Sequence, residues 1–361
     1  MSATLQRPPA GPLPHRRAVR LGPVSGTWTP RGVLVPLVLA ALCALLVALG
    51  VARGDLALPL GDVLRILAGG GEGAERFVVV DLRLPRALTG LLVGASFGLA
   101  GALTQTITRN PLASPDLLGI TAGAGAAAVA LIVLGGGAAG GALAYVGLPL
   151  SALLGGLLTG VAVYALAWRG GIDGFRFVLV GIGFSAALGS VTSWLLLRAE
   201  ITDAGRAQVW LTGSLNARGW EHVLPALVAL VVVGGAVLVA AFALRALALG
   251  DDSARGLGVR LQLGQGALLL AGVVLAAVAT ACAGPIAFVA LCAPQIALRL
   301  VRSPGPPLLA SALVGAAIVL GGDLVARTLL PVELPVGIVT AALGAPYLLH
   351  LLVRRTREAS A

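Results

Sequence analysis

Charged side chains are scarce in this chain, and the few places where they gather are the first candidates for chemistry. The 361 residues include 25 basic and 15 acidic ones, and charged residues make up only 11% of the total. Arg83 and Arg86 lie on either side of a Leu-Pro pair, and Asp323 precedes Arg327 by four residues. Four residues are about one turn of a helix, so Asp323 and Arg327 can pair on one helix face. These groups are suited to ion pairs and to binding a charged partner.

The residue types argue against several kinds of catalytic site. All 25 basic residues are Arg, so the chain lacks the Lys that the phosphate-binding loop of an ATPase requires. The three His are far apart and the three Cys form no Cys-x-x-Cys pair, which argues against a metal site. Asp251 and Asp252 are the only adjacent acids and have no His nearby, which disfavours a membrane enzyme such as a lipid transferase. We therefore expect no enzymatic activity, no metal and no bound cofactor.

The composition predicts an all-α polytopic membrane protein. Hydrophobic residues make up 58% of the chain, whereas charged residues are less than half as frequent as in a typical soluble domain. A bilayer core needs about 20 apolar residues per helix, and such runs recur ten times. We expect the spans at residues 33–51, 87–107, 113–134, 147–168, 177–197, 223–244, 263–282, 286–301, 308–329 and 335–353.

The distribution of Arg predicts the orientation of these ten spans. Ten spans place both termini on one side, and sixteen of the 25 Arg fall on that side. The positive-inside rule then predicts that both termini are cytoplasmic in a plasma-membrane protein. This distribution also accounts for the net charge of +10, so no nucleic-acid partner is expected.

The chain divides into one membrane domain and two tails. Residues 1–31 are rich in Pro and Arg and are predicted to form a disordered basic cytoplasmic tail, which could touch anionic membrane lipid. Residues 32–355 form the predicted ten-helix domain, and residues 356–361 form a C-terminal cytoplasmic tail.

Two features of the predicted spans bear on packing and on mechanism. Gly90, Gly94 and Gly98 line one helix face, which lets another helix of the same chain approach closely. No charged residue falls at the centre of a predicted span. An ion-coupled secondary transporter, one alternative function, requires such an intramembrane group. The sequence therefore favours a permease that is powered from elsewhere.

Four stretches do not have the pattern of an ordinary membrane helix, and together they resemble one family. They are Arg83-Leu84-Pro85-Arg86 with Arg109-Asn110-Pro111-Leu112-Ala113, then Leu249 to Val259, Gly284-Pro285-Ile286-Ala287-Phe288, and Glu333-Leu334-Pro335 with Gly344-Ala345-Pro346. This pattern resembles the FecCD family, the permease subunits of ABC importers for iron–siderophores, haem and vitamin B12. The resemblance covers about residues 33–355. Ala290 and Gln295 depart from it, because the family usually has Gly and His there.

The resemblance implies a fold, partners and a cargo. It implies the BtuC-like fold of type II ABC importers, with two permease subunits around one path, whether identical or paralogous. It implies a substrate-binding protein outside and separate ATP-binding subunits inside, which bind the ATP. The expected cargo is a ferric siderophore, and the alternatives are vitamin B12 and haem.

The resemblance also assigns candidate site residues. Arg83, Arg86 and Arg327 would meet carboxylates of the binding protein, although Arg327 could instead simply pair with Asp323. Asp251 or Asp252 can cap a short helix and Gly256 or Gly258 can end it, as a coupling helix that contacts the ATPase requires. The residues implied for that contact are Gly250, Ala254, Arg255, Gly256, Leu257 and Gly258, and those implied for an inner gate are Gly174 and Phe175.

Overall fold

The computed structural model describes residues 17–21, 24–54, 58–71, 73–135, 142–169, 173–303, 305–328 and 332–360. Within them, seven helices are long and apolar enough to cross a membrane, and three shorter apolar helices bring the total to ten. The prediction of ten apolar helices is therefore confirmed. The long ones are α1 (Pro30–Ala52), a continuous helix Gly73–Thr108, α6 (Ala142–Ala167), α7 (Gly174–Arg198), α9 (Trp220–Val239), α12 (Leu261–Ala283) and α14 (Leu308–Thr328).

The continuous helix and the remaining elements complete the bundle. The helix Gly73–Thr108 consists of α3 (Gly73–Arg76), the π-helical segment η1 (Phe77–Arg83) and α4 (Leu84–Thr108). Pro85 lies at the start of α4 but does not begin the helical stretch, because the chain is already helical from Gly73. The other helices are α2 (Leu60–Leu67), α5 (Ile120–Leu134), α8 (Ile201–Leu211), α10 (Ala241–Ala248), α11 (Asp251–Gly256), α13 (Val289–Val301) and α15 (Val336–Ser360).

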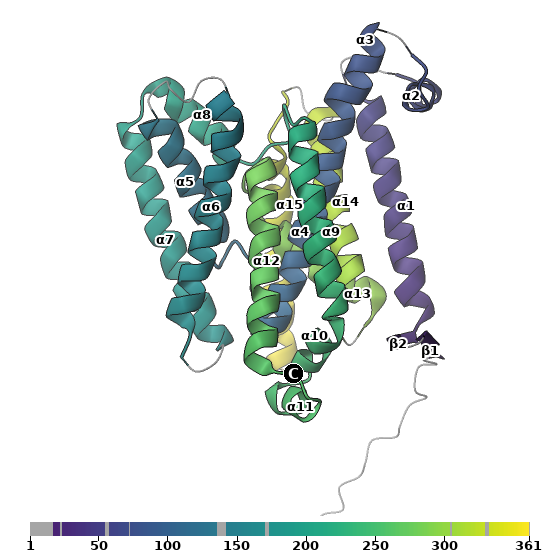
Figure 1. Ribbon diagram of the computed structural model, residues 1–361, viewed down its shortest axis with the longest axis vertical. Helices are drawn as coiled ribbons and strands as arrows, with labels where there is room; N and C mark the ends of the chain where they lie inside the picture. The colour runs from purple at the N-terminus through teal and green to yellow at the C-terminus, as the bar shows by residue number, and fades with distance from the viewer. Residues whose placement is uncertain are drawn as a thin grey trace, which may run out of the picture.

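The two ends of the bundle are different. In Figure 1, α2, α3 and α8 lie at one end, which we call the α8 end. The short helix α11 lies at the other, which we call the α11 end. The first helix, α1, begins at the α11 end, and α15 finishes there. This placement is the one expected for an even number of spans.

The helix α4 occupies the centre of the bundle and packs closely on α14. A Cβ atom added to Gly94 would lie 2.5 Å from the carbonyl oxygen of Gly315, and one added to Gly98 would lie 2.2 Å from that of Ser311. Real Cβ atoms do not approach backbone so closely, so only Gly fits at these two positions. The predicted small-residue face is confirmed, and its partner is a helix of the same chain.

Two of the predicted spans are shorter in the structure. The predicted span 113–134 becomes α5, which begins at Ile120, and the predicted span 286–301 becomes α13, which begins at Val289. A left-handed residue precedes each helix, Gly119 with φ +79° and Phe288 with φ +66°. The buried carboxylate of Asp116 interacts with the Thr121 side chain and with the backbone of Phe288, and so connects the two breaks.

One departure from the family pattern has a structural role. The side-chain amide of Gln295 on α13 donates to Gln105 Oε1 on α4 at 2.7 Å, and Gln105 Nε2 donates to the carbonyl oxygen of Leu291 at 3.0 Å. Gln295 therefore satisfies a buried polar side chain of the central helix, which an apolar residue could not do.

Two short strands lie within residues 1–31, the stretch predicted to be a disordered tail. Two antiparallel strands, β1 (Arg17–Leu21) and β2 (Val24–Trp28), pair there, and α1 already begins at Pro30. The stretch contains β-branched and aromatic residues that favour strands, a signal that its Pro and Arg content obscured. Residues 1–16 lie outside the described residues.

Candidate functional site

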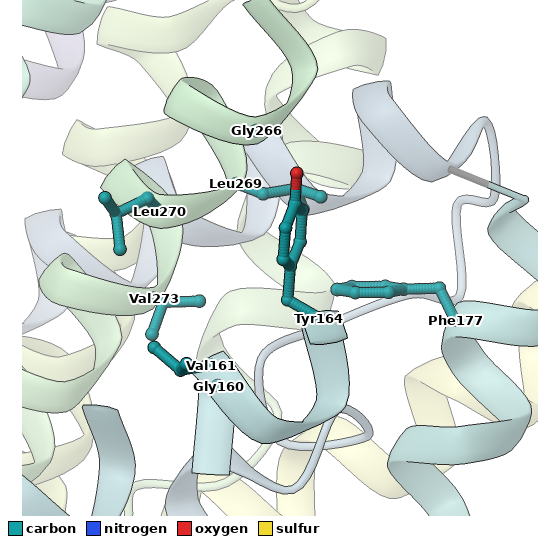
Figure 2. Close-up of a pocket in the computed structure, with 8 residues that line it drawn as sticks. All are labelled: Gly160, Val161, Tyr164, Phe177, Gly266, Leu269, Leu270 and Val273. Atoms are coloured by element: carbon teal, nitrogen blue, oxygen red, sulfur yellow. The ribbon is translucent and has the colours of Figure 1, made fainter. Parts of the chain in front are cut away.

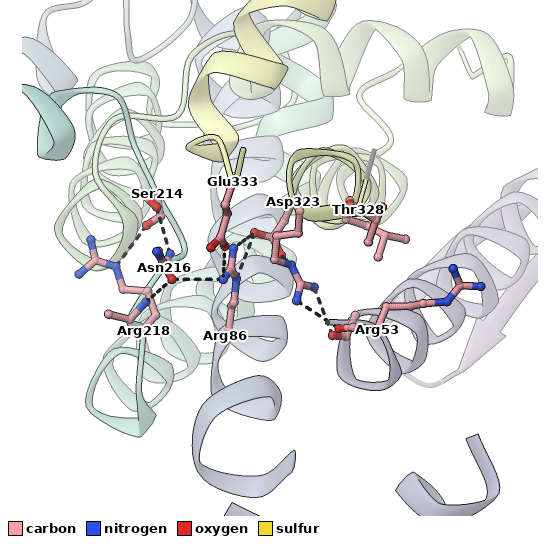
Figure 3. Close-up of polar contacts among 12 residues, drawn as sticks. Arg53, Arg86, Ser214, Asn216, Arg218, Asp323, Thr328 and Glu333 are labelled. Atoms are coloured by element: carbon pink, nitrogen blue, oxygen red, sulfur yellow. Dashed lines mark hydrogen bonds and ion pairs between the residues drawn. The ribbon is translucent and has the colours of Figure 1, made fainter. Parts of the chain in front are cut away.

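At the α8 end, Arg86 on α4 lies at the centre of a network of charged side chains (Figure 3). Its Nε and Nη2 atoms donate to Asp323 Oδ1 on α14 at 3.2 and 2.8 Å. Its Nη1 atom pairs with Glu333 Oε1 at 2.8 Å and also donates to Asn216 Oδ1 at 3.3 Å. The Arg86 and Asp323 side chains are only 13% and 7% exposed. Arg86 thus joins three separate segments of the chain in a partly buried network.

Arg327 extends this network to α1. Its Nε atom lies 3.1 Å from Asp323 Oδ2, so the pairing predicted from the four-residue spacing is formed. Its Nη2 and Nη1 atoms donate to the carbonyl oxygens of Gly50 at 3.2 Å and Arg53 at 3.4 Å. These carbonyl groups lie at the C-terminal end of α1, where the helix offers no further backbone N–H groups to bond them. We call Arg86, Asp323, Arg327 and Glu333 the arginine cluster.

Arg83 lies at the same end and binds backbone carbonyl groups at the end of α1. Its Nη1 atom donates to the carbonyl oxygens of Val51 at 3.0 Å and Ala52 at 3.4 Å. All three arginines implied for docking therefore gather at one end of the bundle. The sequence could not show that Arg86 is already engaged within the chain, because the carboxylate of Asp323 reaches Arg86 from a position 237 residues away.

At the α11 end, residues 251–256 of the segment 249–259 form the short helix α11. Its cap differs from the prediction: Gly250, with φ +109°, is the N-cap, while Asp251 and Asp252 lie in the first helical turn. Gly is favoured at this position because its φ is positive. Gly258, with φ +82°, follows the end of the helix.

Most of the residues implied for the ATPase contact are open to a partner. Arg255, Gly256, Leu257 and Gly258 are exposed and form a continuous stretch. Ala254 is fully buried, so it packs the helix onto the bundle rather than facing outward.

The two adjacent acids of α11 have different partners. Asp251 forms an ion pair with Arg109, the residue that follows α4, and accepts a hydrogen bond from Gln265 Nε2 on α12 at 3.3 Å. Asp252 pairs at 3.3 Å with Arg255 of its own helix. Of the two acids, Asp251 is therefore the one whose side chain bonds to other elements of the described structure.

The residues implied for an inner gate lie close to these contacts. Gly174 is the first residue of α7, and a Cβ added to it would lie 2.3 Å from the carbonyl oxygen of Thr108, the last residue of α4. The carboxylate of Asp173 caps α7 by accepting from the backbone N–H of Phe175 at 2.9 Å and of Arg176 at 3.4 Å. The Phe175 side chain is exposed. The start of α7 is thus fixed against the end of α4.

An apolar cavity of about 320 Å³ lies between α6, α7 and α12 (Figure 2). Gly266 keeps it open beside Tyr164, because a Cβ there would lie 2.9 Å from the Tyr164 hydroxyl oxygen. None of the residues implied for docking, coupling or gating lines it. The lining residues are Gly160, Val161, Tyr164, Phe177, Gly266, Leu269, Leu270 and Val273.

Comparison with known proteins gives the geometry a context. The model of the FecCD transport family matches residues 42–354, which is most of the chain. The chain belongs to the FecCD transport family. This membership confirms the prediction of a permease subunit of an ABC importer, and not an ATPase, in a multi-pass membrane protein.

Individual relatives cover nearly the whole chain. It is 39% identical to the ferric enterobactin transport system permease protein FepG of Escherichia coli (strain K12) over 331 residues, which are 91% of this chain and 98% of that protein. It is 39% identical to the vitamin B12 import system permease protein BtuC of Serratia proteamaculans (strain 568), over 86% of this chain and 92% of that protein.

A solved structure confirms the predicted fold. The chain superposes on an inward-facing structure of a metal-chelate type ABC transporter with a TM-score of 0.76 at 28% identity. The match covers 89% of this chain and 99% of the other. In this FecCD permease, the arginine cluster and α11 are therefore at opposite ends of a known transporter fold.

Proposed function

We propose that this FecCD permease carries ferric siderophores across the plasma membrane into the cell, with energy from ATP hydrolysed by a separate subunit. The observation that carries the proposed cargo is the match to the ferric enterobactin permease over 91% of this chain and 98% of that protein. The chain has few groups for cargo chemistry of its own, so the binding protein selects the chelate.

Vitamin B12 is the second candidate cargo. The vitamin B12 permease is also 39% identical to this chain, although over a smaller share of it, 86%. The match to the ferric enterobactin permease covers a larger share of this chain, 91%, which favours the ferric siderophore.

The charge at the α8 end supports docking of an acidic surface. In the arginine cluster, two arginines face the carboxylates of Asp323 and Glu333, and Arg83 adds a third guanidinium nearby. Three guanidinium groups gathered at one end favour the carboxylates of a substrate-binding protein. Glu333 is 44% exposed and pairs with the Nη1 atom of Arg86, so we expect that an incoming carboxylate can replace it.

The positive-inside rule predicts that the α11 end faces the cytoplasm. There the exposed stretch from Arg255 to Gly258 fits a partner surface, and the ATPase is the partner that an ABC permease requires. ATP-driven movement of α11 would then open and close a path gated at Gly174 and Phe175, as in other domain-closure mechanisms.

A second permease subunit would complete that path. Only 11% of the residues in the apolar window of α7 are buried within the chain, against 89% for the helix that contains α4. Membrane lipid can also cover an exposed apolar helix face, so exposure alone does not identify a subunit contact. The exposure of α7 supports such a contact because the proposed gate lies at the start of the same helix.

The cargo is tested by uptake in a strain from which this chain is deleted. Labelled ferric siderophores, vitamin B12 and haem are compared before and after the gene is restored. Loss and recovery of ferric siderophore uptake alone is the expected result. Loss of vitamin B12 or haem uptake alone would overturn the proposed cargo and leave the permease assignment in place.

A further inference from the structure

Two polar side-chain contacts between α11 and other helices are made by Asp251. Asp251 pairs with Arg109 and accepts from Gln265, so it joins α11 to the end of α4 and to α12. Arg109 in turn donates through Nη2 to the carbonyl oxygen of Leu247 in α10 at 3.4 Å. Four helices are therefore connected through the Arg109–Asp251 ion pair.

The position of Arg109 makes this connection mechanically important. Arg109 has a left-handed backbone, with φ +50°, and ends α4. The residue before it, Thr108, is the one whose carbonyl oxygen contacts Gly174 at the start of α7. If α11 moves and displaces Arg109, the movement therefore reaches the start of α7 through Thr108 alone.

The exposure of the ion pair suits a contact that changes during a cycle. The side chains of Arg109 and Asp251 are 45% and 41% exposed. Exposed pairs contribute little to stability, so this one can lengthen or break without unfolding the bundle. Asp252, one residue away, is 99% exposed and contacts only Arg255 of its own helix through an ion pair.

We propose that Asp251 is a positioning residue that transmits movement of α11 to the start of α7 through its ion pair with Arg109. The proposal rests on the proposed role of α11 as the ATPase contact. It assigns different roles to two adjacent acids that have the same charge and lie in the same helical turn.

The test compares Asp251→Asn and Arg109→Gln with Asp252→Asn, which removes the same charge from the same turn. Each variant is reconstituted in proteoliposomes with its ATPase and binding protein, and the number of ferric siderophore molecules moved per ATP is measured. We expect this ratio to fall roughly fivefold or more for the first two variants, the size of a typical coupling between sites. We expect Asp252→Asn to keep the wild-type ratio.

A double variant with the two charges exchanged distinguishes a loss of the ion pair from a loss of folding. The double variant Arg109→Asp with Asp251→Arg restores an ion pair of opposite direction, and we expect it to recover most of the lost ratio. A ratio in Asp251→Asn equal to that in Asp252→Asn would overturn the proposal. A double variant no better than the worse single variant would also overturn it.

A measurement without cargo keeps this test independent of the proposed substrate. Spin labels at Ser253 on α11 and Phe175 on α7 report their distance with and without a non-hydrolysable ATP analogue. We expect nucleotide to shift this distance in Asp252→Asn but not in Asp251→Asn. Equal shifts in both variants would overturn the proposal, whereas a wild-type protein that shows the shift but moves no ferric siderophore would overturn only the cargo.

Discussion

The two ends of α4 are each held by an arginine, but in contrasting ways. At the α8 end, Arg86 is 13% exposed and is bound by two carboxylates and an amide from three other segments. At the α11 end, Arg109 is 45% exposed and pairs with one carboxylate, Asp251. The same residue type therefore makes a partly buried, multiply bonded contact at one end and an exposed, single ion pair at the other.

This contrast assigns different mechanical roles to the two ends. A buried network of several bonds holds a fixed geometry, since a guanidinium that loses its carboxylate there is left without water. An exposed ion pair can be broken at little cost. We infer that the α8 end is a rigid platform for docking and that the α11 end is the part that moves when ATP is used.

The largest expected effect comes from breaking the network at the α8 end. Asp323→Ala leaves both Arg86 and Arg327 without their shared, buried carboxylate. We expect a loss of about 3–5 kcal/mol in stability, as for other buried pairs that lose one partner. Thermal unfolding of the purified protein measures this. A loss no greater than that of Asp251→Ala would contradict the contrast between the two ends.

The next largest effect comes from the contact between α4 and α14. Gly98→Val places side-chain atoms where Ser311 backbone already lies, and we expect about 1–3 kcal/mol of destabilisation or more. Gly183→Val is the matched control, because nothing lies within 4 Å of a Cβ there. The same unfolding measurement applies. Equal stability of the two variants would contradict the close contact between Gly98 and Ser311.

A smaller effect is expected when the exposed partner of Arg86 is neutralised. Glu333→Gln should change stability by less than about 1 kcal/mol, because Glu333 is 44% exposed. It should strengthen capture of the binding protein, since Arg86 becomes available to an incoming carboxylate. Binding to the permease in nanodiscs measures this, with Asp62→Asn, which removes an exposed acid from α2 and leaves the cluster intact, as the control. Unchanged or weaker capture by Glu333→Gln would contradict docking at Arg86.

Much of the fold was predictable because apolar length and small-residue spacing are local signals. The ten apolar helices and the face formed by Gly90, Gly94 and Gly98 follow from residues within one or two turns of one another. The interaction of Asp116 with Phe288 was not predictable, because the two residues are 172 positions apart in the sequence.

The sequence positions of the candidate sites were predictable, but the burial and the partners of their side chains were not. The family resemblance indicated Arg86 and the segment around Asp251. It could not show that Arg86 is partly buried, since that depends on the long-range partner Asp323. It also could not distinguish Asp251 from Asp252, because only the fold determines which of them lies beside Arg109.

The most direct test of a rigid and a moving end is a pair of distance measurements in the assembled transporter. One pair of spin labels joins Asp81 to Thr328 at the α8 end, and the other joins Ser253 to Phe175 at the α11 end. The native Cys43, Cys282 and Cys292 are buried, which limits unwanted labelling. We expect a non-hydrolysable ATP analogue to shift the distance at the α11 end and to leave the distance at the α8 end unchanged. A shift at the α8 end as large as that at the α11 end would contradict the account.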